Sequence, residues 1–300
     1  MIRQITLWLS AFRLRTLPLS LASILMGSFL ANRLLDWRIF TLSILTTIFL
    51  QILSNLANDY GDSIHGADSS ERKVAQRAVQ SGKITAEQMK KAVILFAILS
   101  FLSGMALLVV AIQNLATFLF FLTLGIFAIF AAIAYTNGKR PYGYAGLGDI
   151  SVMIFFGWVA VFGTYFLHTQ SIDFQIFMPA FTCGFFATAV LNVNNIRDIE
   201  TDQKAGKISI PVRLGREKAV IYHWFLLVSG MLCTVIYTFL HFESVWQFLF
   251  ILSFPLILKN GFAVQNIKDS AKLDPYLKQM AISTLLFVLS FGAGMWIRLL

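Results

Sequence analysis

The sequence predicts an all-α integral membrane protein in which nine transmembrane helices surround a central cavity. Of the 300 residues, 57% are hydrophobic and 13% are charged, with a mean hydropathy of +0.73, and a soluble chain of this length needs more polar surface. The apolar residues form repeated runs of about 20 residues, the length of a helix that crosses a bilayer. Lys and Arg gather in alternate loops between these runs. Together these three observations exclude a soluble globular domain.

The apolar runs predict nine crossings. In chain order they cover residues 16–33, 39–57, 92–112, 115–136, 147–168, 174–193, 219–240, 245–264 and 279–299. The eighth is the least regular, because Pro255 interrupts it and Lys259 follows. No short apolar core with a small-residue cleavage site opens the chain, so we expect no removable signal peptide. Cys183 and Cys233 lie in separate apolar runs, which predicts buried thiols without a disulfide or metal role.

The loop charges predict the orientation of the helices. If the basic N-terminal segment is cytoplasmic, the loops after the second, fourth, sixth and eighth runs lie on the same side. Only Arg33, Arg38 and Arg298 of the 24 Lys and Arg residues then lie on the other side. We therefore expect a multi-pass protein of the bacterial inner membrane with a cytoplasmic N-terminus. Topology and attraction to anionic lipid account for the net charge of +9, so no nucleic-acid partner is expected.

Two of the cytoplasmic loops carry clusters of carboxylates and amides. The segment "NLANDYGDSIHGAD" follows the second run, and "NVNNIRDIETDQKAGKISIPVRLG" follows the sixth. The clusters repeat at four-residue intervals, with Asn58 and Asp62 in the first and Asn194, Asp198 and Asp202 in the second. If each apolar helix continues into its loop, each set falls on one helical face. Like charges on one face repel, so the spacing predicts a bound cation.

The donor set indicates which cation. All candidate ligands are oxygens, which favours a hard cation over zinc or iron. Mg²⁺ commonly takes one or two carboxylates and completes its shell with water and substrate phosphates. Nearby Lys and Arg residues would suit a diphosphate, and an apolar tail could enter from the membrane. One Asp-rich loop would more often be a helix cap, but two loops of matched spacing on one face favour a site that the loops cap on the cytoplasmic side.

The chain is predicted to form a single transmembrane domain over residues 1–300 with a weak internal repeat. The repeat pairs residues 16–136 with 147–264, and the final helix at 279–299 is appended. After each acidic cluster come basic residues, a Gly and a new helix, as in "RAVQSGKITAEQMKKAV" and "VRLGREKAVIY". Thr85 and Gln88 predict a capping box at the start of the third crossing. The repeat would place both clusters at equivalent positions on one membrane face.

The two acidic segments resemble the paired aspartate motifs of the UbiA superfamily of intramembrane prenyltransferases. The resemblance covers nearly the whole chain, including "RLRTLPLSLASILMGS" and "QILSNLANDYGD". Within the superfamily, "YTNGKRPYGYAGLGDISV" and "AGKISIPVRLG" are most similar to the branch that prenylates 1,4-dihydroxy-2-naphthoate in menaquinone synthesis. The resemblance implies an Mg²⁺-dependent enzyme with polyprenyl diphosphate and this naphthoate as substrates, working in contact with membrane lipid.

The resemblance also assigns roles by position. The implied metal ligands are Asn58, Asp59, Asp62, Asp68, Asn194, Asp198 and Asp202. The implied catalytic residues are Asp62, Asp198, Asp202, Tyr135 and Lys139, of which the last two form a Tyr-x-x-x-Lys segment. The implied diphosphate contacts are Asn58, Arg77, Lys207 and Arg213, and Arg13 is the implied acceptor contact. The chain departs from the common pattern at Asp68, which follows Asp62 by six residues, at Leu14 after Arg13, and at "VAQ" before Arg77.

The implied chemistry is ionisation of the allylic diphosphate, attack by the naphthalene ring and loss of the ring carboxylate as CO₂. Candidate π faces for the allylic cation are Tyr135, Tyr142, Tyr144 and Trp158. The small residues Gly143, Ala145, Gly146 and Gly148 could open a slot for a bicyclic acceptor, or form a flexible loop.

A sister activity on 4-hydroxybenzoate, in ubiquinone synthesis, remains an alternative. A cation-coupled transporter is a second, although transporter sites lie near the bilayer midplane and these acids lie at one face.

Overall fold

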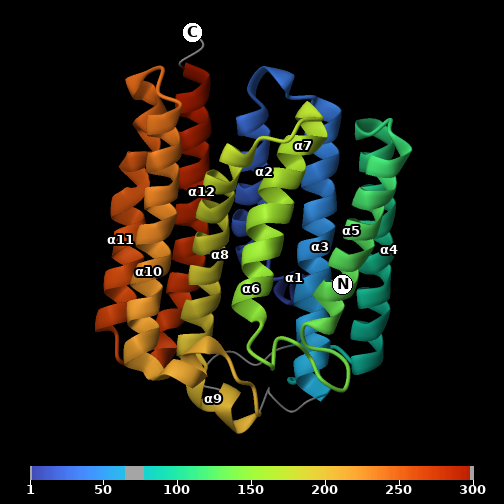
Figure 1. The fold of residues 1–300 in the computed structure, drawn as a ribbon. Coiled ribbons are helices and arrows are strands. Elements are labelled where there is room, and N and C mark those ends of the chain that lie inside the picture. Colours follow the sequence, from blue (N-terminus) through green and yellow to red (C-terminus); the bar gives the residue numbers. More distant parts are fainter. Residues whose placement is uncertain (1, 65–77, 298–300) are drawn as a thin grey trace.

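The computed structural model describes residues 2–64 and 78–297, and within these ranges the chain is helical with no strand (Figure 1). The α-helices are α1 (Ile2–Phe12), α2 (Leu17–Ala31), α3 (Trp37–Ile64), α4 (Ala86–Ala111), α5 (Leu115–Ala134), α6 (Gly148–Val152), α7 (Gly163–Thr169), α8 (Phe177–Arg197), α9 (Ile199–Lys204), α10 (Ile210–Leu240), α11 (Phe254–Asn266) and α12 (Asp274–Ile297). Short helical segments complete the fold: η1 (Leu14–Thr16), η2 (Asn32–Leu34), η3 (Met153–Phe162), η4 (Phe174–Ile176), η5 (Val245–Ser253) and η6 (Ser270–Leu273).

Nine helical segments in the described ranges are long and apolar enough to cross a membrane, as the sequence predicts. The protein is therefore a multi-pass membrane protein. The fifth crossing is composite, since the π-helical η3 joins α6 to α7. The eighth begins as the 3₁₀ segment η5 and continues as α11, where Pro255 occupies the first turn and loses no helical hydrogen bond.

The seventh crossing differs most from its predicted bounds. Its helix begins at Ile210 rather than near residue 219, because the charged first turns of α10 carry no apolar signal. Gly215, with φ of 73°, kinks the helix there and separates these turns from the apolar run. At the third crossing, the predicted capping box is present, with Thr85 and Gln88 each bonding the other's backbone N–H.

The helices form two flanking groups around a shared middle (Figure 1). α10, α11 and α12 lie on one side, α4 and α5 lie on the other, and α2, α3, α8 and the fifth crossing stand between them. The largest apolar core joins α8 and α12, where the buried rings of Phe186 and Phe287 meet edge to face at 5.2 Å. A second core packs α3 on α4 through Leu53, Leu56 and Met89.

The fifth crossing is pressed against α8 and leaves its other face toward α3 and α5. Gly157 makes this approach possible, since a Cβ built there would lie 2.8 Å from the carbonyl oxygen of Ala180 and 3.2 Å from the Cα of Gly184. The helix ends that carry the acidic segments lie together as well. The end of α3 and the short α9 occupy the same end of the bundle (Figure 1), so both acidic segments share one membrane face.

Candidate active site

The first acidic segment is the last two turns of α3. The helix continues to Ile64, so Asn58 and Asp62 lie one helical turn apart on one face, and Asn55, Asp59 and Asp62 are buried. The backbone N–H of Ala78 donates to Asp59 Oδ2 at 3.3 Å, and Asp59 Oδ1 has no hydrogen-bond partner among the described residues. Thr136 Oγ1 donates to Asn58 Oδ1 at 3.2 Å. The loop after α5 is thereby attached to this face.

The second acidic segment does not continue as one helix, which corrects the sequence expectation. α8 ends at Arg197, Asp198 adopts φ −101° and ψ 13°, and α9 begins at Ile199. The Asp202 N–H donates to the Asp198 backbone carbonyl at 2.8 Å, and the Lys207 N–H donates to the Asp202 backbone carbonyl at 2.9 Å. Lys207 Nζ lies 3.3 Å from Asp202 Oδ2. Asp198 and Asp202 are both buried.

Arg197 engages both oxygens of Asp198. Its Nε donates to Asp198 Oδ1 at 2.8 Å and one terminal nitrogen donates to Oδ2 at 2.7 Å. It also donates to Asn194 Oδ1 at 2.8 Å and to Asp274 Oδ1 at 2.5 Å, and Arg15 donates to Asp274 Oδ2 at 2.9 Å. Four alternating charges thus connect the N-terminal segment, α12 and the second acidic segment.

The loop between α5 and α6 joins the two acidic segments. Its Tyr144 hydroxyl donates to Asp62 Oδ1 at 2.8 Å, and its Tyr144 carbonyl accepts from Ile208 N–H at 2.8 Å. Arg213 contacts the same loop, because one of its terminal nitrogens donates to the Ala145 carbonyl at 2.7 Å. The first segment is therefore bonded to the side chain of Tyr144 and the second to its backbone.

Tyr135 stands at the start of this loop, where it is the C-cap of α5. Its ring meets that of Tyr142 edge to face at 5.3 Å. Burial raises the pKa of Tyr135 to about 12, with Lys207 acting against this rise and Asp149 and Asp62 adding to it, so the phenol stays protonated. Added Cβ atoms at Gly143 and Gly148 would come within 2.9 Å of the Tyr135 ring and 2.7 Å of its hydroxyl. Tyr135 itself therefore occupies the space that the small loop residues were expected to leave for an acceptor.

The carboxylates also interact electrostatically. Burial raises the pKa of Asp202, Lys207 lowers it, and the charges of Asp198 and Asp62 raise it again. Asp202 is thus subject to the charges of Lys207, Asp198 and Asp62 together.

Several predicted residues lie elsewhere or outside the described ranges. Asp68 and Arg77 fall in residues 65–77, which the structure does not describe. Lys139 is exposed, and no hydrogen bond or ion pair joins it to either acidic segment in the described part of the chain. Arg13 lies in the turn between α1 and α2 with φ of 48°, and its carbonyl accepts from Thr16. That turn is tied to the site helix, because Asn55 donates to Thr16 Oγ1 at 3.1 Å.

Sequence reasoning missed Arg197 and Asp274 as partners of the second segment, and Tyr144 as a partner of Asp62. It also missed Asp149, a buried carboxylate in the first turn of α6 that accepts from the Tyr222 hydroxyl at 3.2 Å. An acidic residue inside an otherwise apolar span is a usable signal for Asp149. No comparable signal pairs Arg197 with Asp274, which are 77 positions apart.

The donor chemistry fits a hard divalent cation. The clustered side chains offer carboxylate oxygens, and the buried Asp59 Oδ1 lacks a hydrogen-bond partner in the described ranges. Within residues 2–64 and 78–297, however, no three His, Cys, Asp or Glu side chains already converge as a metal site. Arg197 and Lys207 instead neutralise Asp198 and Asp202.

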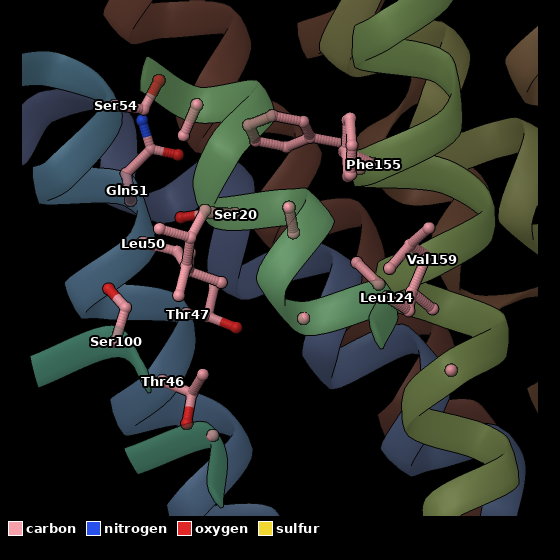
Figure 2. Close-up of a pocket in the computed structure, with 18 of the residues that line it drawn as sticks. Ser20, Thr46, Thr47, Leu50, Gln51, Ser54, Ser100, Leu124, Phe155 and Val159 are labelled. Carbon is pink, nitrogen blue, oxygen red and sulfur yellow. The ribbon is translucent and has the colours of Figure 1, made fainter. Parts of the chain in front are cut away.

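A cavity of about 390 Å³ leads from this cluster between the helices. Asn58, Tyr135 and Tyr142 line it at the end that carries the acidic segments, and Leu108 and Leu167 line it far from that end. Figure 2 shows its two walls. Hydroxyl and amide side chains such as Thr46 and Gln51 stand on one wall, and Leu124, Phe155 and Val159 form the other.

Comparison with known proteins identifies the family. The model of the UbiA prenyltransferase family matches residues 20–291. The chain is 46% identical over 298 residues to a 1,4-dihydroxy-2-naphthoate octaprenyltransferase of Haemophilus influenzae, covering 98% of this chain and 97% of the relative. It is 43% identical over 295 residues to the protein of the same name from Escherichia coli K12, covering 96% of each.

Solved structures show the same fold. An apo UbiA homologue from Aeropyrum pernix K1 superposes with a TM-score of 0.72 at 17% identity, over 96% of this chain and 99% of that one. A UbiA homologue from Archaeoglobus fulgidus bound to DMAPP and Mg²⁺ gives a TM-score of 0.60 at 20% identity, over 95% and 98%. The nine crossings, the paired acidic segments and these matches lead to one conclusion: the chain is a member of the UbiA prenyltransferase family.

Proposed function

We propose that this enzyme transfers a polyprenyl group from polyprenyl diphosphate to 1,4-dihydroxy-2-naphthoate. Diphosphate and CO₂ leave, and the product is demethylmenaquinol for menaquinone synthesis. The observation that carries the proposal is the meeting of two acidic segments, through Tyr144, at one end of a largely apolar cavity. The naming of the 43–46% identical relatives supports the choice of acceptor.

The donor would bind with its diphosphate at the acidic cluster and its tail in the cavity. Lys207, with a side chain only 11% exposed, would contact the diphosphate together with Arg213. Asn58 lines both the cluster and the cavity, which suits a contact at the junction of head and tail. Arg77 and Asp68 remain proposed contacts in the undescribed loop.

Mg²⁺ would be held by Asp62, Asp198 and Asp202, with Asn58, Asp59, Asp68 and Asn194 as further proposed ligands. When bound, this ion would neutralise the leaving diphosphate. Tyr144 would orient Asp62 through its hydrogen bond, and Lys207 would stabilise the negative charge that develops as the allylic C–O bond breaks. Arg197 would hold Asp198 in position through its two hydrogen bonds.

The allylic cation needs a dry site with electron density nearby. The aromatic rings of Tyr135 and Tyr142 line the cavity beside the cluster and would face the cation, at about 0.5–2 kcal/mol for a well-placed contact. The acceptor carbon that bears the carboxylate then forms the C–C bond with the allyl carbon. Breaking the bond to the carboxylate returns its electron pair to the ring and releases CO₂.

The acceptor carboxylate needs a cation, which we assign to Arg13, with Lys139 as the second candidate. The turn of Arg13 is bonded to α3 through Thr16 and Asn55, which supports a position near the site. The exposed position of Lys139 requires the loop after α5 to move before Lys139 can contact a substrate.

We further propose that the acidic face is cytoplasmic, in a bacterial inner membrane, with the loops capping the site. The charge asymmetry of the loops supports this orientation. The single domain would consist of the weak repeat, residues 16–136 and 147–264, with the last helix appended.

A competition assay tests the proposal. Purified full-length protein receives one polyprenyl diphosphate, Mg²⁺ and equal amounts of 1,4-dihydroxy-2-naphthoate and 4-hydroxybenzoate. We expect prenylated naphthol product with one CO₂ released per transfer. Prenylated 4-hydroxybenzoate with its carboxylate retained, as the dominant product, would assign the enzyme to the ubiquinone branch. Absence of diphosphate release with either acceptor would reopen the transporter alternative.

A further inference from the structure

Three glycines line the cavity at positions where helix packing does not require a small residue. Gly104 on α4, Gly125 on α5 and Gly163 at the start of α7 all line it. A Cβ added at Gly125 would meet nothing within 4 Å. At Gly104 it would only touch Thr46 Cγ2 at 3.7 Å, and at Gly163 only Phe121 Cε1 at 3.8 Å. Gly163 is buried and Gly104 half-buried, so the space beside them belongs to the cavity, and Gly125, which is itself exposed, lines it as well.

The other helical glycines with negative φ contrast with these three in the described ranges. At each of them an added Cβ would come closer than 3 Å to a neighbouring atom, as at Gly157 against the Ala180 carbonyl. Those glycines permit helices to approach one another. The three cavity glycines are not needed for such a close approach, since an added Cβ would clash with nothing. Gly in a helix interior also lowers helix stability relative to larger residues. Their small size therefore serves the width of the cavity.

The three glycines lie at increasing depth from the acidic cluster. Gly125 is ten residues from Tyr135 along α5, or roughly 15 Å. Gly104 faces Thr46, which is twelve residues from Asn58 along α3, or roughly 18 Å. Gly163 faces Phe121, fourteen residues from Tyr135, or roughly 21 Å. Tyr135 and Asn58 lie at one level, because Thr136 bonds Asn58.

We propose that Gly125, Gly104 and Gly163 determine, in this order of depth, how much of the prenyl tail the enzyme can accommodate. This inference rests on the proposed function, since it assigns the cavity to the donor tail. A side chain at any of the three positions would fill the cavity at its own depth. The remainder of a long tail would then lose its apolar contacts, whereas a tail that ends before that depth would not.

Leu substitutions at the three positions test the proposal through donor binding alone. Full-length Gly125→Leu, Gly104→Leu and Gly163→Leu proteins are titrated with geranyl diphosphate and with octaprenyl diphosphate in Mg²⁺. The measured quantity is the ratio of the two Kd values, in which a general loss of affinity cancels. We expect octaprenyl binding to weaken relative to geranyl binding by at least about 10-fold in Gly125→Leu, since several methylene contacts are lost. The effect should be smaller in Gly104→Leu and smallest in Gly163→Leu.

Matched controls place the same bulk outside the cavity. Ala106→Leu on α4 and Ala116→Leu on α5 change exposed positions on the same two helices, and their ratio should equal that of the wild type. If Gly125→Leu does not fold, Gly125→Ala provides the measurement, with a smaller shift in the same direction. An unchanged ratio in the glycine variants, or a shift without dependence on depth, would overturn the proposal.

Donor binding does not involve the acceptor, so a wrong acceptor assignment would leave this test unaffected. Failure of the wild type to bind either donor would instead refute the proposed function.

Discussion

Asp198→Asn should separate the role of Asp198 in catalysis from its role as the partner of Arg197. Arg197 has a side chain 3% exposed, and Asp198 accepts two of its hydrogen bonds. Asn keeps one oxygen acceptor and loses the charge, so about one charge-assisted bond is lost, or roughly 1.5–3 kcal/mol. Asp274 still bonds the guanidinium, so the buried cation keeps a counter-charge and the protein should fold with a melting temperature lowered by several degrees.

Catalysis should suffer more than stability. A carboxylate that helps neutralise the leaving diphosphate contributes several kcal/mol, so we expect kcat to fall by at least ~100-fold. The assay is diphosphate release in detergent, at saturating Mg²⁺ and well below the melting temperature of the variant. Arg197→Gln is the matched control, because it removes the same ion pair and leaves the Asp198 carboxylate in place. Its activity should fall by less than about 10-fold. An equal loss in both variants would show that Asp198 acts only as the partner of Arg197.

Three further predictions follow from the site and the topology. Asp62→Asn should lower kcat by at least ~100-fold while the protein remains folded, and wild-type turnover at saturating Mg²⁺ would remove Asp62 from the metal-binding set. Tyr144→Phe removes one hydrogen bond to a charged group and should lower kcat roughly 10-fold, and an unchanged kcat would show that Asp62 needs no such support. Cysteines introduced at Ser63 and Gly206 should react with an impermeant thiol reagent from one side of the membrane, and one at Asp173 from the other. Labelling of all three from a single side would contradict the nine-crossing topology.

Local patterns predicted much of the fold. The nine apolar runs, the capping box at Thr85 and the shared face of Asn58 and Asp62 all depend on residues within one or two helical turns. The break at Asp198 was not predicted, because the four-residue spacing of the second segment is compatible with an unbroken helix. Beside the break, Arg197 is held by Asp274 of α12, a contact between distant residues that no local pattern contains.

The candidate site was predicted in composition and less well in arrangement. The four-residue spacing of the aspartates pointed to Asp62 and Asp202, and the family resemblance pointed to Lys207. The role of Tyr144, which hydrogen-bonds to both segments, could not be predicted, because it depends on the fold of the loop after α5. In the same way, the sequence left open whether Gly143 and Gly148 form a slot or a flexible loop, and the structure shows Tyr135 packed against both. Spacing predicts which side chains share a face, and only tertiary packing decides which space remains.

The ion pair between Arg197 and Asp274 connects the last helix, α12, to the charges of the candidate site. Asp274 begins α12, the helix that lies outside the predicted repeat, and it supplies a counter-charge to a cation buried in the second half. Without Asp274 that cation would be buried against Asp198 as its sole carboxylate partner in the described residues, leaving less of the charge of Asp198 for other partners. The ninth helix therefore adjusts the charge balance of the site as well as completing the bundle.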